Sequence, residues 1–271
     1  MEYFDLDYGQ NRIRCHFAGK GRELILCLHG FGESGSSFEP FVSLCGDRYT
    51  LVCPDLPFHG ETDWKERYFQ PGDLAEIIRL IQERFGVGQS VVLGFSMGAR
   101  PALSAIAEIP ERVSRLILLA PDGLKENLWQ QFSSRTWVGN RLLRYFIESP
   151  GIFFLSARLG RSLGLVHEGV YKFIVFNMDE PEKRRRVYQV WTGLKEMKTR
   201  ISVLRRKMNR DQMPLLVALG RFDRLIPEAT IQRLFGKMTS CRILSLPLGH
   251  MLIHAQTCEA IGEWLGNTPG P

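Results

Sequence analysis

The sequence predicts an α/β fold with a mostly parallel β-sheet and helices on both of its faces. Three observations support this prediction. Short runs rich in apolar and β-branched residues recur along the chain, helical patterns separate them, and the runs are apolar throughout instead of alternating with polar residues. Strands that are buried on both faces of a parallel sheet have this appearance. The runs lie at 24–30, 50–55, 90–96, 116–122, 215–223 and 241–250.

The composition places the chain among globular proteins. Its 271 residues suit one large domain, or one core that carries an insertion. With 44% hydrophobic and 24% charged residues, the disordered and fibrous classes are excluded. No stretch approaches the roughly 18 to 20 apolar residues of a membrane span. The acidic start lacks the pattern of a signal peptide. We therefore expect a cytoplasmic protein with no membrane span.

The remaining core elements follow in chain order. Residues 3–17 predict an antiparallel hairpin at the edge of the sheet, with its turn near Gly9. Apolar residues at helical spacing in 72–86 predict a helix, and Asp73 is its candidate N-cap. A further helical pattern begins after Pro227, and the last one contains Trp264.

Residues 123–198 interrupt this alternation, because they hold several helical patterns and no convincing strand. A connection of this length inside one domain is usually an inserted subdomain. We therefore divide the chain into a core, 1–122 and 199–271, and an insertion, 123–198. The insertion holds 12 of the 29 aromatic residues, and we expect most of them to form its own small core. Among them are Trp129, Phe132, Trp137, Phe153, Phe154, Tyr171, Phe173 and Trp191.

The cysteines and histidines give no metal-binding pattern. The six cysteines lie far apart without a CxxC pair, so we expect reduced, buried thiols. His250 and His254 are four residues apart but lack a third ligand. We therefore expect no metal site.

Ser96 is the candidate nucleophile. It lies in GFSMG at 94–98, where a predicted strand ends and a predicted helix begins, and this is the setting of a nucleophile on a tight, strained turn. Gly94 and Gly98 suit that turn because they carry no side chain to collide with the neighbouring strand and helix. Ser96 is then expected at the carboxyl end of the sheet, where open α/β sheets bind ligands.

A serine hydroxyl requires a base, and the base requires an orienting group. His250 follows the last predicted strand and is the candidate base. Asp223 comes directly after the strand that starts at 215 and is the candidate orienting carboxylate. Asp122 also follows a strand and stays open as the alternative to Asp223.

Backbone N–H groups are the natural donors to the oxyanion that forms when a serine attacks a carbonyl. The N–H of Phe31, in HGFG at 29–32, and the N–H of Met97, at the start of the helix after Ser96, are the candidate pair. Phe58 and Phe95 are candidates to bind the acyl part of the substrate.

With HGFG, DLPFHG at 55–60, GFSMG, the aspartate after the strand at 215 and the GH near the end, the chain resembles the α/β-hydrolase superfamily over essentially its whole length. The resemblance implies the α/β-hydrolase fold, a helical cap formed by 123–198, and no cofactor. The chain order Ser, Asp, His is that of the superfamily. A serine nucleophile, in place of aspartate, argues against the haloalkane dehalogenases and epoxide hydrolases of the same fold.

Two features depart from the superfamily pattern. Pro101 falls early in the helix after the nucleophile, where only the first turn tolerates proline. His59 and Thr62 replace the more frequent second small residue and serine of the DLPFHGET loop. Neither removes the triad, but both bear on the shape of the pocket.

Motifs and resemblance together predict a serine hydrolase that cleaves a small to medium carboxylic ester or thioester through an acyl-enzyme on Ser96. Alternatives are a lyase or carbon–carbon bond hydrolase that uses the triad on an acidic metabolite, and a non-catalytic hydrolase-fold receptor. Arg100 is similar to the arginine that menaquinone-pathway lyases use near an acidic substrate, and it is a candidate substrate contact. A salt bridge is the other interpretation of this residue.

The formal charge of +6 is concentrated in one segment. Residues 123–210 hold 18 of the 35 Lys and Arg and 7 of the 29 Asp and Glu, which leaves 17 basic and 22 acidic residues elsewhere. One interpretation is a solvated basic face. The other is a surface that steers an anionic substrate or an acidic acyl carrier protein, in which respect the chain is similar to esterases that act on carrier-bound pimeloyl groups. No nucleic-acid motif accompanies the charge. The candidate steering residues are Arg141, Arg144, Arg158, Arg161 and part of the run 184–186.

Overall fold

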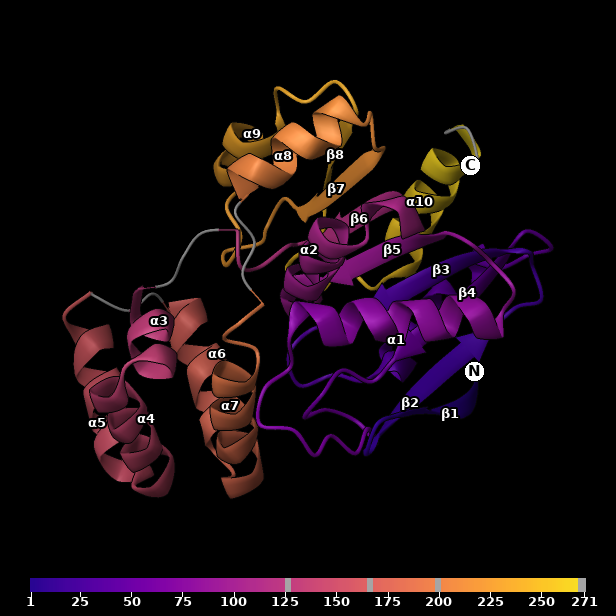
Figure 1. Cartoon of the computed structure of the whole chain (residues 1–271). Coiled ribbons are helices and arrows are strands. Elements are labelled where there is room, and N and C mark those ends of the chain that lie inside the picture. The colour runs from indigo at the N-terminus through magenta and orange to yellow at the C-terminus, as the bar shows by residue number, and fades with distance from the viewer. Residues whose placement is uncertain (125–127, 165–167, 198–200, 268–271) are drawn as a thin grey trace. The chain divides into compact units, whose positions relative to one another are not determined.

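The computed structural model describes residues 1–124, 128–164, 168–197 and 201–267 (Figure 1). The chain divides into two compact units. The core unit comprises Met1–Lys125 and Met197–Pro271, and the helical unit comprises Glu126–Glu196. Both boundaries lie within three residues of those expected from the sequence.

The core unit contains an eight-stranded sheet in the order β1-β2-β4-β3-β5-β6-β7-β8. β1 and β2 form an antiparallel hairpin at one edge, β2 pairs antiparallel with β4, and all other neighbours are parallel. The predicted hairpin and all six predicted strands are confirmed. The strands are β1 (Glu2–Tyr8), β2 (Asn11–Ala18), β3 (Glu23–Leu28), β4 (Tyr49–Pro54), β5 (Ser90–Phe95), β6 (Val113–Leu119), β7 (Leu215–Gly220) and β8 (Cys241–Leu246).

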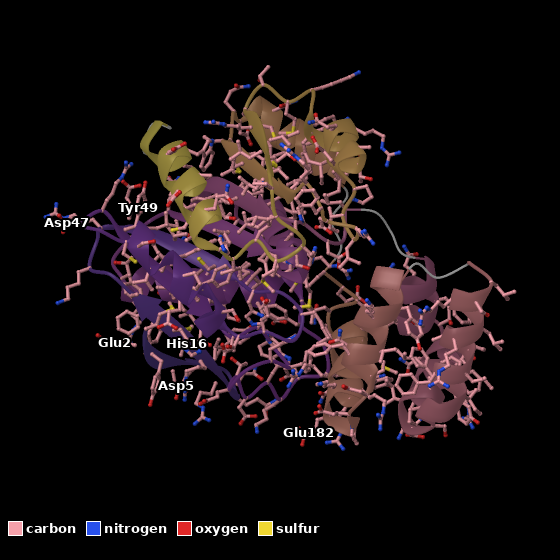
Figure 2. All side chains as sticks on the ribbon, turned by 180° about the vertical axis from the view of Figure 1, so that it is seen from behind. Glu2, Asp5, His16, Asp47, Tyr49 and Glu182 are labelled. Carbon is pink, nitrogen blue, oxygen red and sulfur yellow. The ribbon has the colours of Figure 1, made fainter. Side chains whose placement is uncertain are left out.

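Both faces of this sheet are covered, and this explains why the runs are apolar throughout. On one face the strands pack against η1 (Gly35–Leu44) and α10 (Ala255–Asn267), with Phe38, Phe41 and Trp264 in the shared core. α1 (Pro71–Arg84) and α2 (Ala99–Glu108) cover the other face. Figure 1 shows α1 in front of the sheet, and Figure 2, seen from behind, brings α10 to the front.

The start of α1 differs from the prediction. Asp73 is not the N-cap, because Pro71 occupies the first helical position with its φ already fixed near the helical value, so Gln70 becomes the N-cap. Asp73 sits three residues inside and accepts a hydrogen bond from the Gln70 N–H at 2.7 Å. This is the return bond of a capping box. The carboxylate also accepts the Tyr8 hydroxyl at 2.8 Å and so ties α1 to the hairpin.

The predicted helices after Ser96, after Pro227 and around Trp264 are present, and α8 is a helix that was not predicted. A 3₁₀ turn, η2 (Ser96–Gly98), leads into α2, so that Pro101 falls in the first turn as its chemistry requires. A second 3₁₀ turn, η3 (Pro110–Arg112), follows α2. α8 (Ile201–Arg210) contacts α9 (Glu228–Phe235), where the Arg205 guanidinium donates to the Leu234 carbonyl at 3.0 Å. α9 begins after Pro227, and Trp264 lies in α10.

The helical unit contains α3 (Leu128–Arg135), α4 (Trp137–Glu148), α5 (Pro150–Ser162), α6 (Glu168–Met178) and α7 (Pro181–Gly193). The expectation of an aromatic core is confirmed only in part: Phe146, Phe153 and Phe154 are half-buried and in ring contact, but no described aromatic side chain of this unit is fully buried. Phe132 and Trp137 are exposed, whereas the largest buried side chains are aliphatic or methionine: Leu143, Met178, Val187, Val190 and Leu194. The side chains of Trp129 and Phe173 lie outside the described residues.

All six cysteines are free thiols, five of them buried and Cys241 partly exposed. Burial raises the pKa of the Cys241 thiol to about 12, so this sulfur stays protonated and unreactive at neutral pH. Within the described ranges no cluster of three potential metal ligands is found. No described helix combines the length and apolarity that crossing a membrane demands.

Candidate active site

Ser96 lies on a strained turn between β5 and α2. Its φ of 48° is in the left-handed region that non-glycine residues rarely adopt. The two motif glycines are required by close contacts, because a Cβ on Gly94 would lie 2.6 Å from the Gly98 carbonyl oxygen, and one on Gly98 would lie 2.0 Å from the Leu28 carbonyl oxygen. The tight turn predicted from GFSMG is therefore present.

The structure brings Ser96, His250 and Asp223 together. Ser96 Oγ lies 2.9 Å from His250 Nε2, and His250 Nδ1 lies 2.7 Å from Asp223 Oδ2. Each residue follows a strand directly or within four residues, and because β5, β7 and β8 run parallel, their carboxyl ends meet at one edge of the sheet. This convergence places residues up to 154 positions apart in hydrogen-bond contact.

Asp223 is held as an anion. Burial opposes its ionisation, since the side chain is 0% exposed, but hydrogen bonds from His250 and from the amides of Leu225 and Ile226 outweigh burial and lower its pKa. The two amide bonds measure 2.7 and 3.2 Å. A carboxylate can only accept, so it fixes the imidazole with Nδ1 as donor and leaves the Nε2 lone pair facing the Ser96 hydroxyl. This arrangement is able to take a proton from Ser96.

Asp122, the alternative carboxylate, is engaged elsewhere. Its side chain pairs with the Arg100 guanidinium at 2.5 Å and accepts the Gly123 N–H at 2.6 Å. Its own N–H donates to the Ser96 carbonyl at 3.0 Å, so Asp122 supports the nucleophile turn through the backbone. The geometry thus assigns the contact with His250 to Asp223. Arg100 is found in the salt bridge, and its contact with a substrate stays a prediction.

The loop that carries Phe31 is a tight turn from Gly30 to Glu33, with a Glu33 N–H to Gly30 carbonyl bond of 3.4 Å and Gly32 at φ 78°. His29 anchors it. The Leu56 N–H donates to His29 Nε2 at 2.9 Å, which leaves the ring proton on Nδ1, 2.8 Å from the Gly30 carbonyl. Burial lowers the pKa of His29 to about 4, so the ring is neutral and this tautomer persists at neutral pH.

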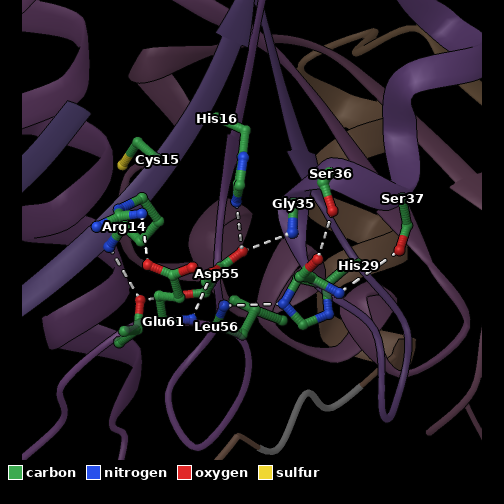
Figure 3. A network of polar contacts seen from close by, with 12 residues as sticks. Arg14, Cys15, His16, His29, Gly35, Ser36, Ser37, Asp55, Leu56 and Glu61 are labelled. Carbon is green, nitrogen blue, oxygen red and sulfur yellow. Dashed lines mark hydrogen bonds and ion pairs between the residues drawn. The ribbon is translucent and has the colours of Figure 1, made fainter. Parts of the chain in front are cut away.

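Asp55 is a second buried anchor that the sequence analysis did not single out, although it opens the DLPFHG motif (Figure 3). Its side chain, 1% exposed, accepts the N–H groups of Gly35 at 2.7 Å and Glu61 at 2.8 Å and lies 3.2 Å from His16 Nε2. Thr62 Oγ1 donates to the Asp55 carbonyl at 2.7 Å. Asp55 therefore fixes the loop 55–62 beside the Phe31 loop, and Thr62 serves this loop locally.

The predicted oxyanion donors are in suitable elements. Phe31 is in the turn after His29, and Met97 is the first residue after Ser96 at the start of η2, where helical N–H groups are left without intrahelical acceptors. Their donation to a substrate oxygen stays a prediction.

The two predicted pocket phenylalanines occupy different environments. Phe58 is half-buried, with an unusual φ of 70°. Phe95 is 1% exposed, and its ring centroid lies 5.7 Å from that of His250. The buried Phe95 ring therefore packs beside His250, and its contact with a substrate stays a prediction. Two exposed apolar side chains, Phe222 and Met251, adjoin Asp223 and His250 in the chain and were not anticipated.

Glu33 is a further residue that the sequence analysis did not single out, and its sequence signal is an acid directly after HGFG. Its Oε2 accepts the Gly30 N–H at 3.0 Å, across the turn that carries Phe31. Burial raises the pKa of Glu33, while the Gly30 N–H and nearby His250 act in the opposite direction. The hydrogen bond from the Gly30 N–H therefore stabilises the loop, but burial makes it less favourable for the Glu33 carboxyl group to ionise.

We expect Glu33→Gln to unfold at a higher temperature than the native chain at neutral pH. The folded pKa of Glu33 is raised, so the folded state binds its proton more tightly and this residue's contribution to stability falls as pH rises above the ordinary value of 4.5. Glutamine keeps an oxygen acceptor for Gly30 without that charge. Thermal melts at pH 4 and 7 test this, and the gain should be larger at pH 7. An equal or reversed gain would contradict the assignment.

With this geometry in view, similarity to known proteins is informative. Residues 23–254 match the family described as alpha/beta hydrolase fold. The chain is 24% identical over 268 residues to the uncharacterized hydrolase YugF of Bacillus subtilis, covering 96% of this chain and 94% of that protein. It is 23% identical over 243 residues to a 2-hydroxy-6-oxononadienedioate/2-hydroxy-6-oxononatrienedioate hydrolase of Paraburkholderia phymatum, covering 83% and 80% of the two chains.

The fold similarity extends over the whole chain. A thermophilic esterase from Thermogutta terrifontis superposes with a TM-score of 0.72 at 20% identity, covering 98% of this chain and 99% of that one. The eight-stranded sheet, the serine turn after β5 and the match over residues 23–254 all agree. The chain belongs to the alpha/beta hydrolase fold family.

Proposed function

We propose that the protein is a serine hydrolase that cleaves a small to medium carboxylic ester or thioester through an acyl-enzyme on Ser96. One observation carries this proposal, namely the continuous chain of contacts from Ser96 Oγ through His250 to the buried Asp223, at 2.9 and 2.7 Å. Nucleophile, base and orienting carboxylate of this geometry activate a hydroxyl that is otherwise unreactive at neutral pH.

In the proposed first step, Ser96 Oγ attacks the substrate carbonyl carbon while its proton passes to His250 Nε2. The N–H groups of Phe31 and Met97 receive the oxyanion. Collapse of this intermediate breaks the bond to the alcohol or thiol, which takes the proton from His250 and leaves the acyl group on Ser96. A water molecule then attacks the ester carbon, His250 accepts and returns its proton, and the acid and free Ser96 are released.

Probe labelling tests this proposal directly. A fluorophosphonate, which phosphonylates activated serines, should label the native chain once, and peptide mapping should place the label on Ser96. Labelling should disappear in Ser96→Ala and fall strongly in His250→Ala. Ser114, at the amino end of β6, provides a matched control, because Ser114→Ala should label as the native chain does. A label on any other serine would overturn the assignment.

Hydrolysis of a carbon–carbon bond is the second candidate, and the curated relatives favour it. Besides the Paraburkholderia phymatum enzyme, a 2-hydroxy-6-oxo-6-phenylhexa-2,4-dienoate hydrolase of Burkholderia cepacia is 29% identical over 156 residues. We would compare kcat/KM for p-nitrophenyl esters and for 2-hydroxy-6-oxodienoates. Preference for the dienoates by a large factor would replace ester hydrolysis as the function, while Ser96 kept its role.

We also propose that the basic helical unit steers anionic or carrier-linked substrates. We leave Arg184 out of this proposal, because its guanidinium donates to the carbonyls of Ile147 at 3.1 Å and Met178 at 2.9 Å and so has a local structural role. Arg144 pairs with Glu148, and the Arg161 guanidinium stacks over the Tyr171 ring at 4.8 Å.

The expected result of this steering is a salt dependence confined to anionic substrates. As ionic strength rises from 0.01 to 0.15 M, the screening length falls from roughly 30 to roughly 8 Å, and kcat/KM for an anionic ester should decline while that for a neutral ester stays constant. Arg185→Gln with Arg186→Gln should blunt the decline, and Arg184 is left intact to preserve its carbonyl contacts. An equal salt response for both esters would leave the charge as a solubility feature.

A further inference from the structure

Helix α5 of the helical unit exposes a continuous apolar stripe. None of its 13 residues is buried, which is unusual for a helix with five large aliphatic and aromatic side chains. At about 100° per residue, its outward aliphatic residues fall within an arc of about 80° that runs about 16 Å along the helix. They are Ile152, Leu155 and Leu159, with Leu163 just after the helix, and they are 49%, 59%, 55% and 70% exposed.

The stripe is not the face by which α5 packs. Phe153 and Phe154 point to the opposite side, where the Phe153 ring lies 5.7 Å from that of Phe146 on α4 and 5.8 Å from that of Phe154. The Arg161 guanidinium on the same inner side stacks over Tyr171 of α6. Inner contacts of α5 are therefore made by one set of residues, and the aliphatic stripe is left to face outward.

Helix α4 adds an exposed apolar face of its own. Trp137, Arg141 and Tyr145 are spaced four residues apart and share one side of the helix, and Val138 lies beside them. Trp137 is 76% exposed, and the Arg141 guanidinium lies 5.7 Å from its ring centroid. The buried residues of α4, Gly139 and Leu143, are on the far side.

The charge on this pair of helices has one sign. Between 137 and 164 the chain carries four arginines and a single acid, Glu148, which Arg144 neutralises at 2.9 Å. Arg141 projects from the middle of the exposed α4 face, and Arg158 flanks the α5 stripe. Exposed aliphatic side chains, an exposed tryptophan and tyrosine, and two arginines, one within the α4 face and one beside the α5 stripe, thus occur on these two helices.

We propose that the outward faces of α4 and α5 form a docking surface for an anionic lipid bilayer, on which the protein rests without crossing it. Helices that lie in a membrane interface combine a leucine-rich face with basic residues that reach lipid phosphates. Tryptophan and tyrosine favour the headgroup depth, where an apolar ring and a polar edge are both accommodated. This inference is independent of the catalytic role of Ser96.

A lipid surface fits these residues better than a protein partner does. The α5 stripe is a convex row of aliphatic side chains, which a fluid acyl layer accepts without a complementary groove. The centre of a protein interface is instead expected to be rich in aromatic and arginine anchors seated in pockets, whereas the α5 stripe has only aliphatic side chains. A second copy of this chain would bring Arg141 and Arg158 against the same two arginines of its partner, so self-association is disfavoured by like charge.

Flotation with vesicles tests the proposal on the full chain. The native protein should bind vesicles of phosphatidylglycerol and phosphatidylcholine and bind pure phosphatidylcholine much more weakly. Leu155→Gln with Leu159→Gln should weaken binding to the anionic vesicles by about tenfold or more, because two buried leucine side chains are lost from the lipid phase. Arg141→Gln with Arg158→Gln should lower binding and also flatten its dependence on salt.

Matched controls lie on α8, where Val203 and Arg206 are exposed in the core unit. Val203→Gln with Arg206→Gln should bind vesicles as the native chain does, and thermal melts of every variant should show that folding is intact. Failure of the native chain to float with anionic vesicles would overturn the proposal, as would native binding by the Leu155 and Leu159 variant. A native dimer in solution that this variant dissociates, without vesicle binding, would assign the face to self-association instead.

Discussion

Replacing Ser96 or His250 with alanine is expected to lower kcat by up to about 10⁶-fold, with a much smaller change in KM. In the proposed mechanism both side chains act in one proton transfer, across the 2.9 Å contact between Ser96 Oγ and His250 Nε2. Loss of Ser96 Oγ or of His250 Nε2 stops that transfer. The kcat of the double variant should therefore be about as low as that of either single variant. Initial rates on a chromogenic ester, with burst analysis for the acyl-enzyme, provide the measurement.

Two controls make this result interpretable. Ser114→Ala makes the same substitution at the amino end of β6, away from the carboxyl ends that carry the triad, and should leave kcat unchanged. Thermal melts should show that the two alanine variants remain folded. Strictly additive losses in the double variant, or substantial turnover by Ser96→Ala, would mean that another group attacks the substrate.

Replacing Asp223 with asparagine is expected to lower kcat by about 10⁴-fold. Asparagine presents an amide that can donate to His250 Nδ1, and the imidazole would then place its proton on Nε2, facing Ser96. The serine hydroxyl would lose its acceptor although the distances stayed similar. The Leu225 and Ile226 amides would still find the side-chain oxygen, so a modest loss of stability is expected.

Asp122→Asn is the matched control for Asp223→Asn. It breaks the salt bridge to Arg100 but leaves the His250 contact intact, so its effect on kcat should be small for a neutral ester. A loss as large as that of Asp223→Asn would show that Asp122 takes part in the proton relay. Equal activity of Asp223→Asn and the native chain would remove Asp223 from the mechanism.

The acid side of the pH profile gives an independent check on Asp223. Its pKa is lowered from the ordinary value of 3.8, so the carboxylate persists to more acidic pH than a free aspartate would. The stability that it contributes is present above pH 3.8 and is lost as pH falls through the lowered value. A loss of activity that begins well above pH 4 therefore does not come from protonation of Asp223. The pH profile of Asp223→Asn should show the same loss of activity.

The sequence analysis located the strands well and their ends less well. The apolar runs at 24–30 and 241–250 extend beyond β3 and β8, because the residues after each strand belong to the site. His29 and His250 are in those extensions. Apolarity alone does not distinguish a strand residue from a buried loop residue, since both are packed against the same core. Asp73 was wrongly predicted to be the N-cap of α1. In the structure Pro71 is the first helical residue, and Asp73 is the third residue of the helix, where it closes a capping box with the N-cap Gln70.

What the sequence determined by itself is the parallel α/β architecture, the strained serine turn and the order of Ser96, Asp223 and His250. Each depends on local patterns, such as runs of apolar residues, paired glycines and the position of a polar residue after a strand. Only the tertiary structure decided that Asp223 and not Asp122 faces His250, that His29 and Glu33 hold the Phe31 loop, and that Asp55 holds the loop 55–62. It also left Phe132, Trp137, Tyr145 and Phe176 of the helical unit exposed, although their sequence pattern had suggested a core. These features depend on contacts between side chains that are far apart in the sequence. Local sequence patterns do not predict such contacts.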